Sequence, residues 1–177
     1  MATNVEIKAR VGDPDNLQGL VEALSDTPAT VIPQEDVFFY TPGGRLKLRV
    51  LAPDEGQLIY YERQDASGPK QSNYMISYTD EPDTLQAVLA GALGVRGIVR
   101  KQRLLYMVGN TRVHLDEVEG LGSFMELEVV LGPGQSGEQG QVIAAELMEK
   151  LEIRASDLID VAYIDLLEAG AADQKED

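Results

Sequence analysis

Strict alternation of polar and apolar residues recurs along the chain and predicts β-strands. In residues 4–11 one face of the predicted strand is apolar (Val5, Ile7, Ala9, Val11) and the other is polar (Asn4, Glu6, Lys8, Arg10). Similar runs cover residues 34–40, 45–50, 57–63, 71–78 and 95–107, and residues 115–131 contain two more, joined at a turn over 119–123. Because several neighbouring runs are tightly connected, the pattern favours an antiparallel meander.

Four helices are predicted between and after these strands. Asp13 and Pro14 are a typical helix start, and Leu17, Leu20, Val21 and Leu24 then form an apolar stripe. Further helices are expected from Glu81 to Gly94, from about Gln139 to Leu151, and from Ser156 onward. Eight strands and four helices predict an α+β domain dominated by one antiparallel sheet, which can close on itself. We expect one domain over residues 1–168 and an acidic, disordered tail over 169–177.

Composition restricts the chemistry. The chain has 177 residues, 44% of them hydrophobic and 25% charged, as in folded soluble proteins. The absence of cysteine excludes thiol catalysis, and a single histidine excludes a multi-histidine zinc site, so any metal must be held mainly by oxygen. Mg²⁺, Mn²⁺ and Ca²⁺ suit such ligands.

Charge and hydropathy bear on partners and location. A net charge of −15 argues against a broad nucleic-acid-binding surface. The sequence has no run long enough to span a membrane and no apolar signal core at its start, so we expect a cytoplasmic protein without a membrane partner. The sequence leaves open whether the chain forms a homodimer.

Like charges gather on single strand faces, and this admits two interpretations. Arg45, Lys47 and Arg49 share one face of a predicted strand, whereas Glu126 and Glu128 share a face of another. Charged strand faces are usually solvated, which would leave the interior of the sheet apolar. The helices, however, have apolar stripes that must cover an apolar sheet face, and this would turn the charged faces into a barrel. Such an interior would suit a triphosphate with Mg²⁺ or Mn²⁺.

Five motifs in order make the sequence similar to the CYTH superfamily, the triphosphate tunnel metalloenzymes. They are Glu6-Ile-Lys8-Ala-Arg10, Gln34-Glu-Asp36, Arg45-Leu-Lys-Leu-Arg49, Lys101-Gln-Arg103 and the stretch from Leu115 to Glu128. Ser156-Asp157 and residues 162–167 resemble the C-terminal helix of the adenylyl-cyclase-like branch, so the resemblance covers residues 4–167. It implies an eight-stranded antiparallel β-barrel forming a tunnel, with flanking helices.

The resemblance also implies roles for individual residues. The candidate metal ligands are Glu6, Asp116, Glu126 and Glu128. The candidate phosphate ligands are Lys8, Arg10, Lys47, Arg49, Arg63, Lys101 and Arg103. The candidate catalytic residues are Glu6, Lys8, Glu126 and Glu128. Asn4 stands where the family signature usually has a further Glu, so this position offers an uncharged oxygen to a metal.

The resulting hypothesis is a metal-dependent phosphohydrolase acting on tripolyphosphate, thiamine triphosphate or a nucleoside triphosphate. The alternatives are a class IV-type adenylyl cyclase, which makes cyclic AMP and pyrophosphate from ATP, and a non-catalytic protein that binds polyphosphate or nucleotides. His114 is either a general base beside Asp116 or, more commonly for a lone strand histidine, a structural hydrogen-bonding residue.

Overall fold

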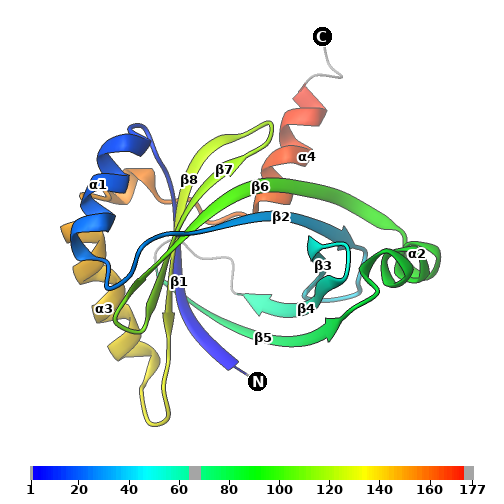
Figure 1. Ribbon diagram of the computed structural model, residues 1–177, viewed down its shortest axis with the longest axis horizontal. Coiled ribbons are helices and arrows are strands. Elements are labelled where there is room, and N and C mark those ends of the chain that lie inside the picture. Colours follow the sequence, from blue (N-terminus) through cyan, green and yellow to red (C-terminus); the bar gives the residue numbers. More distant parts are fainter. Residues whose placement is uncertain (1, 64–68, 174–177) are drawn as a thin grey trace.

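The fold is a closed barrel of eight antiparallel strands, as the sequence predicts (Figure 1). The computed structural model describes residues 2–63 and 69–173. Its strands are β1 (Ala2–Arg10), β2 (Thr30–Phe39), β3 (Arg45–Ala52), β4 (Glu55–Arg63), β5 (Lys70–Thr79), β6 (Val95–Val108), β7 (Thr111–Val118) and β8 (Gly122–Val130). Around the barrel they follow the order β1-β5-β4-β3-β2-β6-β7-β8, and β8 pairs with β1 to close it.

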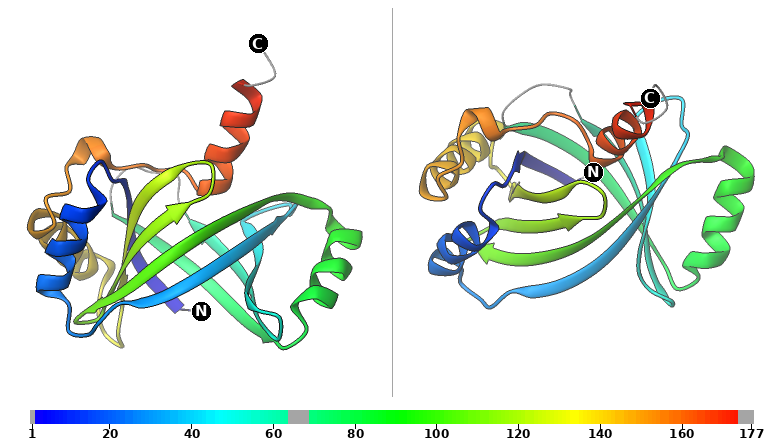
Figure 2. Two further views of the ribbon diagram at one scale, coloured as in Figure 1. Left: turned by 45° about the horizontal axis from the view of Figure 1, so that its top comes forward. Right: turned by 90° about the horizontal axis from the view of Figure 1, so that it is seen from above.

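Four helices flank the barrel. They are α1 (Pro14–Leu24), α2 (Pro82–Leu93), α3 (Gly137–Lys150) and α4 (Tyr163–Asp173). Helices α1 and α3 lie together on one side, α2 lies at the opposite side, and α4 stands apart near β6 (Figures 1 and 2). In the described part of the chain, no helix has the length and apolar character needed to cross a membrane.

The apolar faces of β1, β2, β3, β7 and β8 point outward, where α1, α2 and α3 cover them. Val5, Ile7 and Ala9 of β1 pack in one core with Leu17 and Val21 of α1, together with buried residues of α3. A second core joins β2, β3 and β4 to apolar residues of α2. A third core lies on the inward side, where Phe38 of β2 and Val99 of β6 pack with the first residues of α4 and line the barrel interior. The polar faces are therefore left to line the barrel interior. This rules out the interpretation in which the interior is apolar and the charged faces are solvated.

Helix α3 approaches the barrel closely because it carries a glycine at the contact. A Cβ added to Gly140 would lie 2.7 Å from a methyl group of Val5 and 2.7 Å from one of Leu131. No real side chain tolerates such distances without movement of its neighbours. The absence of a side chain here lets α3 lie directly on β1.

Two predicted boundaries differ from the structure. Strand β2 begins at Thr30, four residues before the run of residues 34–40 from which the sequence predicts it. The fourth helix does not begin at Ser156, which lies in a short 3₁₀ turn (Ala155–Asp157). After this turn Leu158 bridges Ala9, and the Ile159 amide donates to the Lys8 carbonyl at 3.0 Å. Because β1 holds this segment extended, α4 begins only at Tyr163.

The end of the chain also departs from the expectation. Helix α4 continues to Asp173, into the segment from residue 169 that was expected to be disordered. The Asp165 carboxylate accepts the Ala162 amide at 2.9 Å and so satisfies one of the free amides at the start of this helix. Residues 174–177 lie outside the described part of the chain.

Candidate functional site

The barrel encloses a cavity of about 150 Å³ whose lining is mostly charged on one side. Its charged and amide-bearing lining residues are Asn4, Glu6, Lys8, Asp36, Lys47, Arg49, Lys101, Arg103, Arg112, Glu126 and Glu128. They come from β1, β2, β3, β6, β7 and β8. Cations and carboxylates from strands far apart in sequence thus meet in one enclosed space.

One group of cations is organised around Asp36 of β2. Its carboxylate accepts from Lys47 Nζ at 2.7 Å and from Arg49 Nε and Nη2 at 2.9 and 3.0 Å. Burial raises the pKa of Asp36, but the charges of Arg49 and Lys47 outweigh it and hold the pKa well below its usual value. Asp36 therefore stays ionised and holds both cations toward the cavity.

A second group is organised around Asp116 of β7. Arg103 donates to both carboxylate oxygens at 2.6 Å, the Tyr163 hydroxyl donates at 2.9 Å, and Lys101 Nζ lies 3.4 Å away. Burial raises the pKa of Asp116, but the charges of Arg103 and Lys101 lower it by a larger amount, so the resulting pKa is about 2. Burial and the charge of Arg103 lower the pKa of Lys101 to about 7. Asp116 is thus a buried anchor for two cations.

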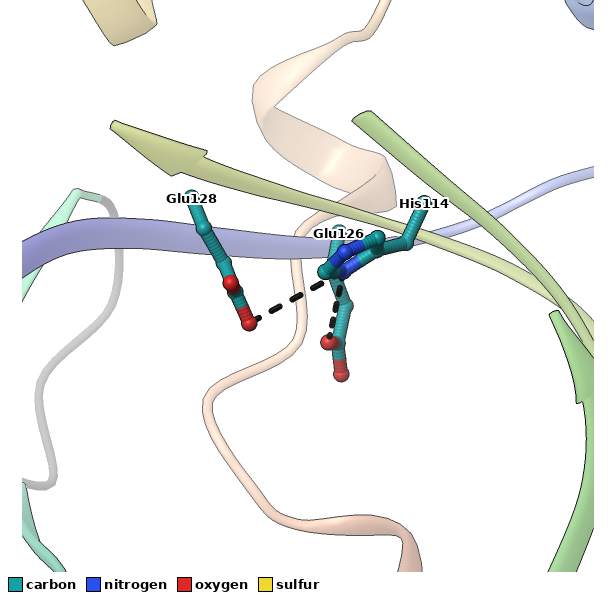
Figure 3. A group of neighbouring side chains, drawn as sticks. All are labelled: His114, Glu126 and Glu128. Carbon is teal, nitrogen blue, oxygen red and sulfur yellow. Dashed lines mark ion pairs between the residues drawn. The ribbon is translucent and has the colours of Figure 1, made fainter. Parts of the chain in front are cut away.

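An acidic cluster lies on β7 and β8. His114, Glu126 and Glu128 each present a possible ligand atom, and these atoms lie within 4.8 Å of one another. His114 Nδ1 is 3.7 Å from Glu126 and 3.8 Å from Glu128, and the three side chains converge on one point (Figure 3). His114 Nδ1 is buried without a hydrogen-bond partner. In the part of the chain that the structure describes, this is the group whose atoms could jointly hold a metal ion.

Two cations connect this cluster to its surroundings. Lys8 Nζ lies 3.3 Å from Glu126 and 3.9 Å from the centre of the Tyr163 ring. Arg103 donates to Glu126 at 2.8 Å as well as to Asp116. Burial raises the pKa of Glu126, but Lys8 and Arg103 outweigh it, so this carboxyl is ionised at neutral pH. Arg103 thereby joins the cationic side of the cavity to the acidic cluster.

Helix α4 contributes a tyrosine to the cavity and is fixed by ion pairs outside it. Ala162 and Tyr163 line the cavity, and Tyr163 packs edge-on against Phe124 with ring centres 5.0 Å apart. Asp165 accepts from Arg45 at 3.1 Å and from Arg96 at 2.6 Å. Arg45 thus secures α4 rather than facing the cavity with Lys47 and Arg49.

The sequence matches one known protein family along almost its whole length. The family description "CYTH domain" matches residues 2–163, nearly the whole chain. The chain belongs to the CYTH family. Comparison with curated protein sequences gives no match.

Solved structures share the CYTH fold at low sequence identity. A Pyrococcus horikoshii protein superposes with a TM-score of 0.83 at 24% identity, covering 92% of this chain and 98% of its own. A candidate adenylate cyclase from Vibrio parahaemolyticus gives 0.76 at 20% identity, covering 93% and 97%. A candidate adenylyl cyclase from Hippeastrum, described as having a dominant triphosphatase activity, gives 0.68 at 19% identity, covering 94% and 96%.

Most of the residues predicted for the CYTH site line one cavity. Of the candidate phosphate ligands these are Lys8, Lys47, Arg49, Lys101 and Arg103, and of the candidate metal ligands Glu6, Glu126 and Glu128. Asp116 is buried behind this lining, held by its cationic partners. Arg10 is exposed, with its guanidinium 5.3 Å from the centre of the Phe124 ring, and does not line the cavity. The Arg63 side chain lies outside the described part.

Three residues of the site were not assigned from the sequence. Asp36 appears in a quoted motif, but its pairing with Lys47 and Arg49 depends on the register of β2 with β3. Arg112 lines the cavity and lies 3.4 Å from Glu128. It stands two residues before His114, and this period-2 spacing could have identified it. Tyr163 has no role assigned from the sequence, because its hydroxyl contact with Asp116 joins residues that are 47 positions apart in the chain.

Proposed function

We propose that this CYTH chain is a divalent-metal-dependent hydrolase of a triphosphate bound in the barrel. The observation that carries the proposal is the meeting of two kinds of group in one cavity. Lys8, Lys47, Arg49, Lys101 and Arg103 face it, and so do the carboxylates of Glu126 and Glu128. Guanidinium and ammonium groups bind phosphate oxygens, while clustered carboxylates bind a divalent cation.

The residues of the acidic cluster fit such a cation. Glu126 and Glu128 offer carboxylate oxygens, and His114 offers a buried nitrogen that makes no hydrogen bond. A buried polar atom without a partner is costly, and a ligand bond would satisfy it. Glu6 lines the same cavity and lies opposite Glu128 in the β1–β8 register. Mg²⁺ or Mn²⁺ bound here would polarise a phosphoryl oxygen and neutralise charge on the triphosphate.

The cationic side would hold the phosphate chain and stabilise its charge during cleavage. In hydrolysis a water molecule adds to the terminal phosphorus, the bond to the bridging oxygen breaks, and orthophosphate and a diphosphate leave. Lys47 and Arg49 are already oriented by Asp36, and Arg103 by Asp116, so little reorganisation is needed when negative charge develops. Lys8, between Glu126 and Tyr163, is suited to hold the transferring phosphoryl group.

The test is a product assay on the purified protein. Orthophosphate, pyrophosphate and cyclic AMP would be quantified with tripolyphosphate, thiamine triphosphate and ATP, each with Mg²⁺ or Mn²⁺ and with EDTA. We expect metal-dependent release of orthophosphate. Cyclic AMP with pyrophosphate from ATP would instead establish cyclisation, which needs the same grip on the phosphates but a different nucleophile. Metal-dependent binding without any product would establish a binding protein and contradict the enzymatic proposal.

A further inference from the structure

One aromatic side chain of the cavity does not come from the strands of the barrel. Tyr163 lines the cavity together with Ala162, and it is the first residue of α4. It is buried, and its hydroxyl donates to Asp116 at 2.9 Å. Helix α4 therefore places a buried ring among the charged groups that the strands supply.

Two lysine ammonium groups contact the ring of Tyr163. Lys8 Nζ lies 3.9 Å from the ring centre, and Lys101 Nζ lies 5.0 Å from it. The two lysines come from β1 and β6, which are not neighbours in the barrel. Lys8 also lies 3.3 Å from a carboxylate oxygen of Glu126. Lys101 lies 3.4 Å from one of Asp116. Each ammonium group thus has two partners, its own carboxylate and the shared ring.

An aromatic ring holds an ammonium group differently from a carboxylate. A carboxylate neutralises the charge, whereas the ring face attracts the cation through its quadrupole and leaves the positive charge available to an anion. A lysine side chain has four flexible bonds and loses conformational entropy when it is fixed. Contact with a rigid, buried ring fixes the lysine before the ligand arrives, so that less of this cost falls on binding.

The ring itself is held in place by the start of α4. Tyr163 packs edge-on against Phe124, with ring centres 5.0 Å apart. The next residue, Ile164, lies on β6 at Gly97, where an added Cβ would be 2.5 Å from Ile164 Cδ1. Asp165 accepts hydrogen bonds from one arginine of β3 and one of β6. These contacts fix the ring from several directions, so the lysine side chains adjust to the ring.

We infer that Tyr163 is a positioning residue of the triphosphate site, whose ring holds Lys8 and Lys101 in the arrangement that binds phosphate. This inference rests on the proposed function, because it takes the two lysines as phosphate ligands. Tyr163 acts through these lysines and not by contact with the substrate. Its hydroxyl bond to Asp116 secures the ring, but the ring carries the role.

Two substitutions of Tyr163 separate the ring from the hydroxyl. Tripolyphosphate would be titrated calorimetrically into the full chain in EDTA. We expect Tyr163→Leu, which removes the ring, to bind at least about tenfold more weakly, and Tyr163→Phe to bind within about threefold of the wild type. Tyr106→Leu is the matched control and should bind as the wild type does. Tyr106 is also buried and donates to a carboxylate, that of Glu22 at 3.0 Å, but it packs outside the barrel with α1.

A spectroscopic signature tests the contact without any phosphate. Protons above an aromatic ring resonate upfield, so the Lys8 methylene protons next to Nζ should be shifted upfield in the wild type and in Tyr163→Phe. The shift should disappear in Tyr163→Leu. Nuclear magnetic resonance measures it, and the Lys8 signal is identified by its absence in Lys8→Arg. An ordinary Lys8 shift in the wild type would overturn the inference, even if Tyr163→Leu does not fold.

The outcomes separate this inference from the proposed function. Equal weakening of tripolyphosphate binding in Tyr163→Leu and Tyr163→Phe, or no weakening in either, would overturn positioning by the ring even if triphosphates are hydrolysed. The same weakening in Tyr106→Leu would also overturn it. The expected binding pattern without release of orthophosphate from any triphosphate would overturn the hydrolase and keep the positioning role. Failure of tripolyphosphate to bind the wild-type protein would contradict both. Circular dichroism of each variant checks that it is folded.

Discussion

The cationic and acidic sides of the cavity are built differently. Lys47 and Arg49 are bound to a buried aspartate, Asp36, and Arg103 and Lys101 to another, Asp116. Each of these cations lies within 3.4 Å of a buried carboxylate in the protein alone. In the acidic cluster, by contrast, the His114 nitrogen makes no hydrogen bond, and its distances to Glu126 and Glu128 exceed hydrogen-bonding range.

The difference indicates which of the two sides also contributes strongly to the stability of the fold without a ligand. A buried ion pair that loses one partner leaves an uncompensated charge, so the cationic groups belong to the folding energetics of the barrel. In the acidic cluster Glu126 is paired with Lys8 and Arg103, whereas Glu128 lies 3.4 Å from the partly exposed Arg112, so the Glu128 carboxylate should contribute less to the fold. Substitutions on the cationic side should therefore affect stability strongly, and substitutions in the acidic cluster should affect metal-dependent chemistry.

The largest effect is expected for Arg103→Ala. Arg103 is buried and donates to both Asp116 and Glu126, so its loss leaves two carboxylates short of their main partner. The free energy of unfolding should fall by about 3–5 kcal/mol, measured by urea denaturation. Arg112→Ala is the control, since that side chain is 41% exposed and has one ion pair, at 3.4 Å; it should cost about 0–1 kcal/mol. If both variants lost the same free energy of unfolding, the cationic side would not differ from the acidic cluster in its contribution to stability.

The next effect is expected for Glu128→Gln on turnover. Replacing the carboxylate by an amide keeps the shape but removes the charge that a divalent ion needs, so metal-dependent kcat/KM should fall about 100-fold. Urea denaturation should show a change in unfolding free energy of about 1 kcal/mol or less. Glu119→Gln, an exposed turn substitution, serves as control and should keep both properties. A Glu128→Gln variant with a much lower free energy of unfolding but an unchanged kcat/KM would show that Glu128 serves stability and not metal-dependent turnover.

The smallest effect concerns pH. Lys101 has its pKa lowered to about 7, below the 10.5 of a free lysine, because burial and Arg103 disfavour its ammonium form. Raising the pH from 6 to 8.5 should therefore neutralise Lys101 and weaken tripolyphosphate binding in EDTA by up to about tenfold. Calorimetry at several pH values measures this, and Lys101→Arg should flatten the profile because arginine remains charged.

The same shift predicts how stability changes with pH. Between about 7 and 10.5 the unfolded chain binds more protons at this lysine than the folded chain. The contribution of Lys101 to stability should therefore rise with pH across this window. A profile that falls there in the wild type but not in Lys101→Met would contradict the shift.

The sequence predicts the barrel well because its two signals are independent and agree. Alternation in strands such as β1 assigns each residue to a face, and the apolar stripe of α1 requires an apolar partner surface. Together these two patterns predict, from the sequence alone, that the side chains of Glu6 and Lys8 point into the barrel. The family resemblance then orders these residues into one site, and the cavity contains most of them.

What the sequence could not predict depends on closure and register. The pairing of Asp36 with Arg49 follows from strand register, and that of Arg45 with Asp165 spans much of the chain. Arg10 keeps the predicted alternation, but near the end of β1 its side chain is exposed beside Phe124. Local sequence patterns do not determine at which residue a strand extends beyond the cavity, or which residue distant in sequence a side chain contacts.

The central claim is that the acidic cluster binds a divalent ion together with a triphosphate. The most direct measurement is a titration of Mn²⁺ into the protein, with and without tripolyphosphate, in which free Mn²⁺ is followed by electron paramagnetic resonance. We predict that tripolyphosphate tightens Mn²⁺ binding in the wild-type protein and in Glu119→Gln, and that Glu128→Gln loses this binding. Mn²⁺ binding with the same affinity in Glu128→Gln as in the wild type, with or without tripolyphosphate, would contradict the claim.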